Sequence, residues 1–423
     1  MAISTYVPWR LRNIGSLLLR AYDVRKLKRY VATHPKPLIA VTGSVGKTTT
    51  CRMTAHVLEG VLGAIGVSGT QGVYIGGRML NKGDHALGYS ALKLVADDRC
   101  AAVVAEMARG GLLKQGLVFD HVDIGVLLNV YDNHLGLKGI DTREQLAELK
   151  SIVVRKATRA AVLNADDPAC MHFYAQCGAE RRYLVSCDTN NPRLQPHRES
   201  GGGVVLLDNG FMYAYRGNEV VARMSAADVP DSHGGVFRPA IISAMNVMAI
   251  SDALDIPFDA IKGRLQSFRS DETSNPGRMN HIDGMPYSLW VTWADGPEVM
   301  RELARFFSHR PCKGRKRIML APMGNRSDAF IRNMADAVLT EFDYFICSDW
   351  ENLRGRPPGY VAGLLASELI DKGIRQQCVH VASNHDEALQ HALSCCEPDD
   401  VLLIVTMSGS KVIHNIRQLQ NLQ

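Results

Sequence analysis

The sequence predicts an α/β protein, in which a parallel sheet containing a phosphate-binding loop (P-loop) is followed by a second, Rossmann-like α/β domain. Short apolar runs alternate with segments of helical character, one run passes directly into Gly46-Lys47-Thr48, and the alternation restarts beyond a loop-like stretch at 270–278. Continuous apolar strands indicate burial on both faces. We therefore expect both sheets to be mainly parallel and covered by helices.

The alternation continues through the first part of the chain. The runs expected to form its strands are 38–41, 101–106, 124–129 and 160–164, and 49–62 fits a helix. A polar, glycine-rich stretch at 193–203 breaks the pattern, and 204–215 resembles an antiparallel excursion. The strands expected in the second part are 317–321, 344–348, 378–382 and 401–406. We therefore divide the chain into a basic helical segment (1–36), a central domain (37–275) and a C-terminal domain (276–423).

Composition indicates a globular protein, with 46% hydrophobic and 22% charged residues. The ten cysteines are scattered and form neither a zinc pattern nor a disulfide framework, so we expect free thiols in a reducing cytosol. No apolar run is long enough to span a bilayer, and no signal peptide is recognisable. The expected location is cytoplasmic.

The basic charge is concentrated in residues 1–36, which carry +7, whereas the whole chain carries +5. Apolar residues recur there at roughly helical spacing. A helix packed on the next domain explains this pattern, and a helix that docks on a membrane surface or a partner is the alternative. No basic–aromatic motif supports nucleic-acid binding, so we expect none.

The segment 37–50 has the order of a strand, a tight turn and a helix start. Backbone amides of such a loop converge on phosphate oxygens, Lys47 can reach the β- and γ-phosphates, and the Thr48 hydroxyl can ligate Mg²⁺. An ordinary glycine turn before a helix is the structural alternative. The residues expected to contact nucleotide in this loop are Gly43, Ser44, Val45, Gly46, Lys47, Thr48 and Thr49.

Polar residues follow several of the expected strands. Ligands of open parallel sheets collect at the carboxyl ends of the strands, so these residues should lie together. Taken one at a time, such residues are also explained without a ligand, as a solvated carboxylate, a structural histidine and a capped turn. The residues are Glu106 as a metal ligand, Asn129, His134 as a ligand of a second metal or a phosphate, Lys150, and Asn164 as a partner of the base.

Several motifs in register resemble the Mur ligase superfamily. They are Thr42-Gly43-Ser44-Val45-Gly46-Lys47-Thr48-Thr49, Glu106 before Ala108-Arg109-Gly110-Gly111, the segment from Asn129 to His134, and Leu163-Asn164-Ala165-Asp166-Asp167-Pro168. The segments 72–77, 82–84 and 108–113 are similar to the Mur-ligase-like half of cyanophycin synthetases. The similarity is strongest over 37–170 and recurs at Pro276-Gly277-Arg278.

The resemblance implies an ATP-dependent ligase that joins a carboxylate to an amine through an acyl phosphate, with ATP and one or two Mg²⁺ ions bound. It implies that Thr48, Glu106, His134 and Lys150 serve metal binding, Lys150 as a carbamylated lysine. Arg278 would contact the γ-phosphate and Thr292 the ribose. Lys47, His134, Lys150 and Arg278 are then the candidate catalytic residues, and closure of the C-terminal domain would exclude water.

The chain departs from the family pattern in the nucleoside half of the expected site. Asn133 stands where the family has an aspartate before the histidine, and Thr292 replaces an aspartate expected at the ribose. Asp295 and Gly296 replace a His-Asn pair, and 322–328 is an altered Gly-Asp-Arg loop. Asp328, Arg354 and Arg356 are weak candidates for substrate contacts. These changes indicate a different amine substrate or weakened nucleotide binding.

Three interpretations remain open: an amide-forming ligase, a catalytically weakened scaffold or partner subunit, and a nucleotide-hydrolysing switch. The substrates would be a small or peptide carboxylate and an amino acid as the amine. We expect the chain to lack room for an ATP-grasp half, so a separate ATP-grasp ligase or another pathway protein is a candidate partner. The resemblance also allows a homo-oligomer.

Overall fold

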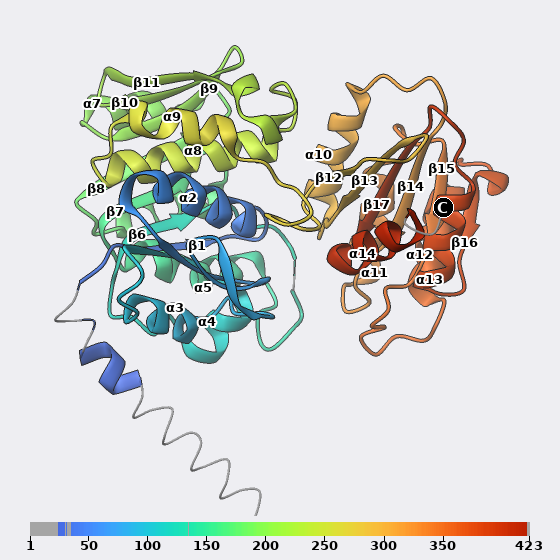
Figure 1. The fold of residues 1–423 in the computed structure, drawn as a ribbon, viewed down its shortest axis with the longest axis horizontal. Coiled ribbons are helices and arrows are strands. Elements are labelled where there is room, and N and C mark those ends of the chain that lie inside the picture. The colour runs from blue at the N-terminus through green and yellow to red at the C-terminus, as the bar shows by residue number, and fades with distance from the viewer. Residues whose placement is uncertain (1–23, 30, 32–34, 134, 421–423) are drawn as a thin grey trace, which may run out of the picture.

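The computed structural model describes residues 24–29, 31, 35–133 and 135–420, which form two α/β units, each built around its own sheet (Figure 1). Residues 24–29 are helical, and most of the basic segment predicted at 1–36 lies outside the described residues. Across the part that is described, none of the helices combines the length and apolar character needed to cross a bilayer.

The first sheet has the strand order β11-β10-β9-β8-β7-β6-β1-β5-β2-β3-β4. Its strands are β1 (Leu38–Thr42), β2 (Ile65–Gly69), β3 (Gly72–Ile75), β4 (Arg78–Lys82), β5 (Ala102–Glu106), β6 (Val122–Leu127), β7 (Ala157–Asn164), β8 (Arg181–Ser186), β9 (Gly203–Asp208), β10 (Phe211–Arg216) and β11 (Glu219–Ser225). Strands from β9 to β2 in this order are parallel, and antiparallel strands extend the sheet on both sides.

Helices cover both faces of this sheet, and a separate apolar core fills each side. On one face lie α2 (Lys47–Leu62), α8 (Arg238–Ala253) and α9 (Phe258–Ser267). On the other lie α3 (Gly88–Val95), α4 (Arg109–Gln115) and α5 (Arg143–Arg155), with the short α6 (Pro168–Met171) and α7 (Leu194–Glu199) further along the chain. Helix α5 starts at a capping box in which Thr142 and Gln145 bond reciprocally. Central strands such as β1 are buried throughout, which explains their continuous apolar sequences.

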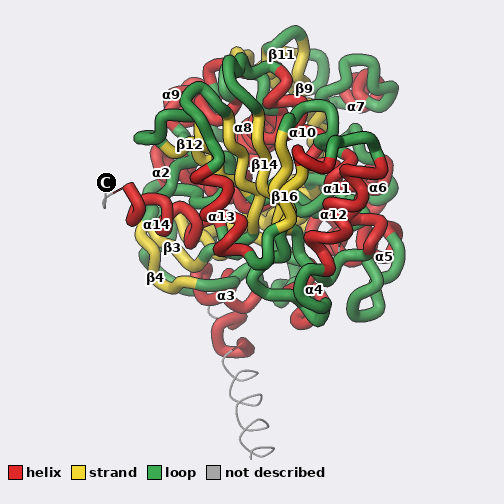
Figure 2. Tube along the Cα trace, turned by 90° about the vertical axis from the view of Figure 1, so that its right-hand side faces the viewer, coloured by secondary structure: helices red, strands yellow, loops and turns green. Residues whose placement is uncertain are grey.

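The second sheet has the order β12-β13-β17-β14-β15-β16, and only β12 is antiparallel to its neighbour among the described strands. Its strands are β12 (Asn280–Ile282), β13 (Ser288–Thr292), β14 (Lys316–Ala321), β15 (Tyr344–Cys347), β16 (Val379–Val381) and β17 (Val401–Thr406). Figure 2 shows α10 (Pro297–Ser308), α11 (Asp328–Asp336) and α12 (Tyr360–Asp371) on one side of this sheet, with α13 (His385–Ser394) and α14 (Gly409–Gln420) on the other.

The predicted fold class is confirmed, with differences in detail. The strand predicted at 124–129 ends at Leu127, and the stretch at 193–203 contains helix α7. The segment predicted as an antiparallel excursion begins with β9, which still pairs in parallel with β8 before the chain turns back into β10. Prediction missed β2 to β4, β8 and β11 to β13. Most of these pair with antiparallel neighbours or lie towards a sheet edge, where the apolar pattern is interrupted.

A buried ion pair fixes the starts of two central strands in the second sheet. The Arg317 Nε donates to Asp400 Oδ2 over 2.7 Å, and the two side chains are 6% and 2% exposed. Asp400 also accepts from the backbone amides of Arg315 and Glu397. Removal of one partner from such a pair leaves a buried charge uncompensated.

We therefore expect Arg317→Met to lower the free energy of unfolding of the second unit by about 3 to 5 kcal/mol. Three of the four tryptophans, Trp290, Trp293 and Trp350, lie in this unit, so urea unfolding followed by tryptophan fluorescence measures the change. The exposed Arg315 is the matched control, and Arg315→Ala should shift the unfolding free energy by no more than about 0.5 kcal/mol. Equal effects of the two variants would contradict the proposed role of the pair.

Candidate active site

A cavity of about 710 Å³ lies between the two units and is lined by residues of both. The first unit contributes the whole loop from Gly43 to Thr50, and the second contributes Arg278, Thr292, Trp293 and Asp295. The volume is within the range of small-ligand sites in proteins. A ligand in this cavity would contact both units at once, so binding would be coupled to their mutual placement.

The P-loop is anchored on the residues that follow β6. The backbone amides of Ser44 and Val45 both donate to Asn129 Oδ1, over 3.0 and 2.9 Å, and Asn129 Nδ2 donates back to the Val45 carbonyl. A side chain at Gly43 would place Cβ 2.9 Å from Leu128 Cβ, and Gly46 has a φ of 86°. Asn129 thus holds the loop in shape by engaging the amides of Ser44 and Val45, and the contacts of the loop with phosphate stay a prediction.

Two lysines converge on the same carbonyl beneath the loop. Lys47 Nζ donates to the carbonyls of Gly43 and Ser44 over 2.9 and 3.0 Å, and Lys150 Nζ donates to the Gly43 carbonyl over 2.8 Å. Burial lowers the pKa of Lys47, and Glu106 opposes this shift. Burial, together with the nearby charges of Lys47 and Arg109, lowers the pKa of Lys150 well below its ordinary value. An anion bound here would relieve this concentration of desolvated cations.

Glu106 ends β5 inside the cavity and is 1% exposed. Its Oε2 accepts from the hydroxyls of Thr48 and Thr70, each over 3.1 Å, and from the Thr70 amide over 3.2 Å. A carboxylate and two hydroxyls form an all-oxygen donor set, which suits Mg²⁺. The chemistry of these residues fits one divalent ion, and the metal-binding roles of Thr48 and Glu106 stay predictions. Thr70, in the turn between β2 and β3, was missed because neither strand was foreseen.

The second unit brings Arg278 towards the loop. Its guanidinium stacks on Trp293, 4.4 Å from the ring centroid, and Arg278 Nη1 donates to the Gly277 carbonyl over 3.1 Å. Burial lowers the pKa of Arg278 to about 10, with Glu106 opposing. The charges of Arg278 and Asp295 also act on Lys47, so the two units are close enough to interact electrostatically.

The residues that differ from the family pattern have structural roles here. The Thr292 hydroxyl accepts from the Met279 amide over 3.2 Å, which ties β13 to the linker. Asp295 forms a bidentate pair with the buried Arg326, at 3.0 and 2.7 Å. Arg356 donates to the carbonyls of Gly324 and Arg326 and so supports the 322–328 loop.

The remaining predicted site residues are placed less directly. Asn164 lines the cavity, but its side chain donates to the Leu128 carbonyl and accepts from the Asp166 amide, both over 2.9 Å. His134 lies outside the described residues. Its neighbour Asn133 is 2% exposed, lines the cavity, and has an Oδ1 with no hydrogen-bond partner among the described residues.

Arg109, like Thr70, is a cavity residue for which no role was predicted from the sequence. It lines the cavity at the start of α4, and its buried Nε has no hydrogen-bond partner within the described part of the chain. Burial lowers its pKa, and the charge of Arg326 lowers it further. The Ala108-Arg109-Gly110-Gly111 motif was the available signal. It marked the family but could not show which way the guanidinium points.

The fold and the site define an α/β protein with a P-loop. The cavity beside the loop is closed on its other side by residues of a second α/β unit. Residues 41–206 match the model of the Mur ligase middle domain. The chain is 31% identical to a cyanophycin synthetase of Synechocystis sp. and 29% identical to one of Crocosphaera subtropica, each over 90% of this chain. These two alignments cover 43% and 44% of those relatives, so the chain spans about two fifths of their length.

Solved structures share the fold of this chain. The folylpolyglutamate synthase/dihydrofolate synthase of Yersinia pestis, complexed with AMPPNP and Mn, aligns with a TM-score of 0.69 at 21% identity over 99% of this chain and 95% of that one. The MurF ligase of Thermotoga maritima, in complex with ADP, aligns with a TM-score of 0.64 at 17% identity, over 95% and 83%. Over residues 41–206 the chain thus matches the Mur ligase middle domain, and its fold is shared with these solved structures.

We predict that Glu106→Gln removes the metal dependence of nucleotide binding. The amide keeps the size of the side chain but loses the anionic oxygens, so Mn²⁺ affinity in the presence of ATP should fall at least about tenfold. Electron paramagnetic resonance of free Mn²⁺ measures this change. Glu59→Gln, on α2 but outside the cavity lining, is the matched control. Unchanged Mn²⁺ affinity in Glu106→Gln would place the ion elsewhere.

Proposed function

We propose that the chain is an ATP-dependent carboxylate–amine ligase that forms a peptide or isopeptide bond through an acyl phosphate. The observation that carries the proposal is the shared cavity, in which Lys47, the Thr48–Glu106 pair and Arg278 meet from two units. Names of the relatives, cyanophycin synthetase and the ligases of murein precursors, support the reaction class. The ligase assignment therefore rests on the site and the family together.

In the proposed reaction the protein positions the reacting groups and balances the negative charge of the phosphates. Lys47 and Arg278 would face the phosphoryl group that moves from ATP to the substrate carboxylate, and their positive charges would balance the developing negative charge. Thr48 and Glu106 would hold Mg²⁺, which neutralises phosphate charge when bound. The amine then attacks the acyl phosphate, and the amide and inorganic phosphate leave. The second unit would keep water from the acyl phosphate while it waits for the amine.

The carboxylate substrate would be recognised by the uncompensated cations of the first unit. Arg109 has a buried Nε without a partner among the described residues, on the same cavity wall as the desolvated Lys150. An anionic group placed there would gain charge-assisted hydrogen bonds that water does not compete for. This supports an acidic small molecule or peptide as acceptor. The amine, by analogy with the family, would be an amino acid presented by the second unit.

A catalytically weakened scaffold or partner subunit is the second candidate. It is favoured by Thr292, whose hydroxyl is already used by the Met279 amide, and by Asn129, which occupies two amides of the P-loop. Such a chain would keep the fold and lose tight nucleotide binding. An ATP-grasp ligase is a candidate partner in either case, by analogy with the cyanophycin synthetases to which the chain is similar.

Calorimetric binding of MgATP separates the two candidates. For a ligase we expect micromolar affinity in the unmodified chain and no measurable binding in Lys47→Ala, because the substitution removes the cation nearest the phosphates. Lys262→Ala, an exposed lysine on α9, should bind like the unmodified chain. Thermal unfolding of each variant confirms that the fold is retained. No binding at millimolar MgATP in the unmodified chain would reject the ligase and favour the scaffold.

We further propose that Lys150 is carbamylated and so provides an oxygen ligand for a second Mg²⁺. Carbon dioxide reacts with a neutral amine, and burial lowers the pKa of Lys150 so that the neutral form persists at a lower pH than in an exposed lysine. Lys47 and Arg109 would then balance the negative charge of the carbamate.

After equilibration with ¹³C-bicarbonate at pH 7.5, we expect one protein-bound carbamate resonance in the ¹³C NMR spectrum. It should be absent in Lys150→Gln and present in Lys114→Gln, which replaces an exposed lysine at the cavity rim. The signal should weaken as the pH falls, since protonation of the amine stops the reaction. Its absence at pH 7.5 in the unmodified chain would show that Lys150 acts as an amine.

A further inference from the structure

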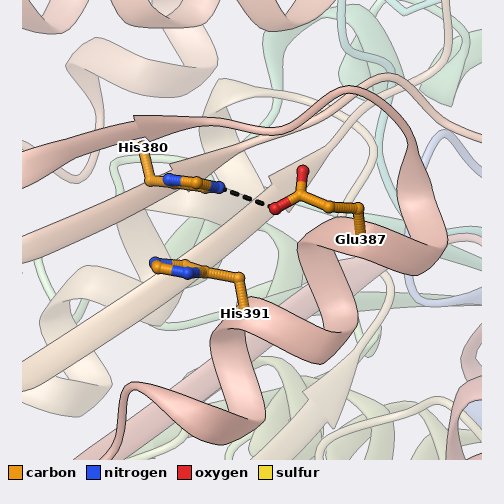
Figure 3. Close-up of side chains that lie close together, drawn as sticks. All are labelled: His380, Glu387 and His391. Carbon is orange, nitrogen blue, oxygen red and sulfur yellow. Dashed lines mark hydrogen bonds and ion pairs between the residues drawn. The ribbon is translucent and has the colours of Figure 1, made fainter.

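A cluster of two histidines and a glutamate lies in the second unit, away from the cavity lining (Figure 3). His380 lies on the edge strand β16, and Glu387 and His391 lie one turn apart on α13. One ligand-type atom from each residue falls within 4.8 Å of the others. We propose that this cluster binds a zinc-class divalent ion, such as Zn²⁺ or Co²⁺, and that the ion fastens β16 to α13.

Two of the three side chains are already oriented by neighbouring groups. Glu387 Oε2 accepts from the Ser383 amide over 2.9 Å, and the Tyr344 hydroxyl lies 3.0 Å from His391 Nε2, which leaves Nδ1 of that ring for an ion. Hydrogen bonds of this kind fix ligand orientation around metals. His380 Nε2 lies 2.9 Å from Glu387 Oε1, and an ion between them would replace this contact.

The donor set distinguishes this cluster from the oxygen ligands of Thr48 and Glu106. Two imidazoles and one carboxylate favour zinc-class ions over Mg²⁺. The histidine rings are stacked, with centroids 3.7 Å apart and planes 12° apart, so one ring must tilt for both to reach an ion. The side chains of His380 and Glu387 are 30% and 37% exposed, which leaves room for this tilt and for a water in the remaining coordination position.

A second group of potential ligands, Glu351, His385 and Asp386, provides the comparison. Its glutamate is already paired with Lys411 over 3.0 Å, and His385 Nε2 is bonded to the Thr406 hydroxyl. A resident cation competes with a metal for that carboxylate. We therefore assign the ion to the cluster around Glu387.

The test is titration of the EDTA-treated full chain with Co²⁺, followed by visible absorption and thermal unfolding, with Mg²⁺ in excess. We expect saturable d–d bands without the intense thiolate charge-transfer bands that cysteine ligands would add, and a higher unfolding temperature. His391→Gln should weaken Co²⁺ affinity at least about tenfold and abolish the thermal shift. Glu351→Gln and His309→Gln should behave like the unmodified chain.

Three outcomes would overturn the proposal: no Co²⁺ binding at millimolar concentration, thiolate bands in the spectrum, or equal affinity in His391→Gln and the unmodified chain. Circular dichroism of the metal-free variants separates loss of the ligand from loss of the fold. Because none of these readouts uses nucleotide or activity, the test is independent of the proposed ligase function.

Discussion

A concentration of desolvated positive charge beneath the P-loop is the constraint on which the cavity depends. Lys47 and Lys150 share the Gly43 carbonyl, and both have lowered pKa values because burial penalises their charged forms. Arg109 adds a third cation near Lys150. Glu106 offsets only part of this charge, and its Oε2 is already engaged by two threonines. A polyanion with its metal would satisfy these groups together, so the electrostatics of the cavity and the chemistry proposed for it are consistent.

The second constraint is geometric and lies in the backbone around the loop. Asn129 ties the amides of Ser44 and Val45 to the residues after β6, and the close approach of Gly43 to Leu128 leaves no space for a side chain. The loop is therefore held by its neighbouring strand before any ligand arrives. Preorganisation of this kind reduces the entropy that binding must otherwise overcome, because loop residues are already ordered. The same hydrogen bonds engage the amides of Ser44 and Val45, so an anion at this loop would be contacted mainly through Lys47 and the start of α2.

The fold class and the phosphate side of the site could be predicted because their signals are local. The apolar run before Gly43, the Gly46-Lys47-Thr48 turn and the carboxylate that ends β5 depend on residues adjacent in sequence. Thr70 and the guanidinium of Arg109 could not be foreseen in the same way. Thr70 reaches Glu106 from the β2–β3 turn, and the Arg109 guanidinium donates to the Leu137 carbonyl, so both placements depend on contacts between distant segments. Asn164 differs from both, because its position in a motif at a strand end was evident from the sequence. The structure, however, shows its side chain hydrogen-bonded to neighbouring backbone groups.

In the second unit, residues that depart from the family pattern form hydrogen bonds with one another. Asp295 stands in the segment where the family has a His-Asn pair, and the structure gives it a buried bidentate partner in Arg326, which Arg356 supports through two carbonyls. A buried guanidinium without such a partner would be strongly destabilising, so the buried Arg326 depends on Asp295. Asp295 lines the cavity, and its charge acts on Lys47. Because Arg326 compensates the Asp295 charge, the proposed ligase would select an amine at this side chain by shape and hydrogen bonding rather than by net charge.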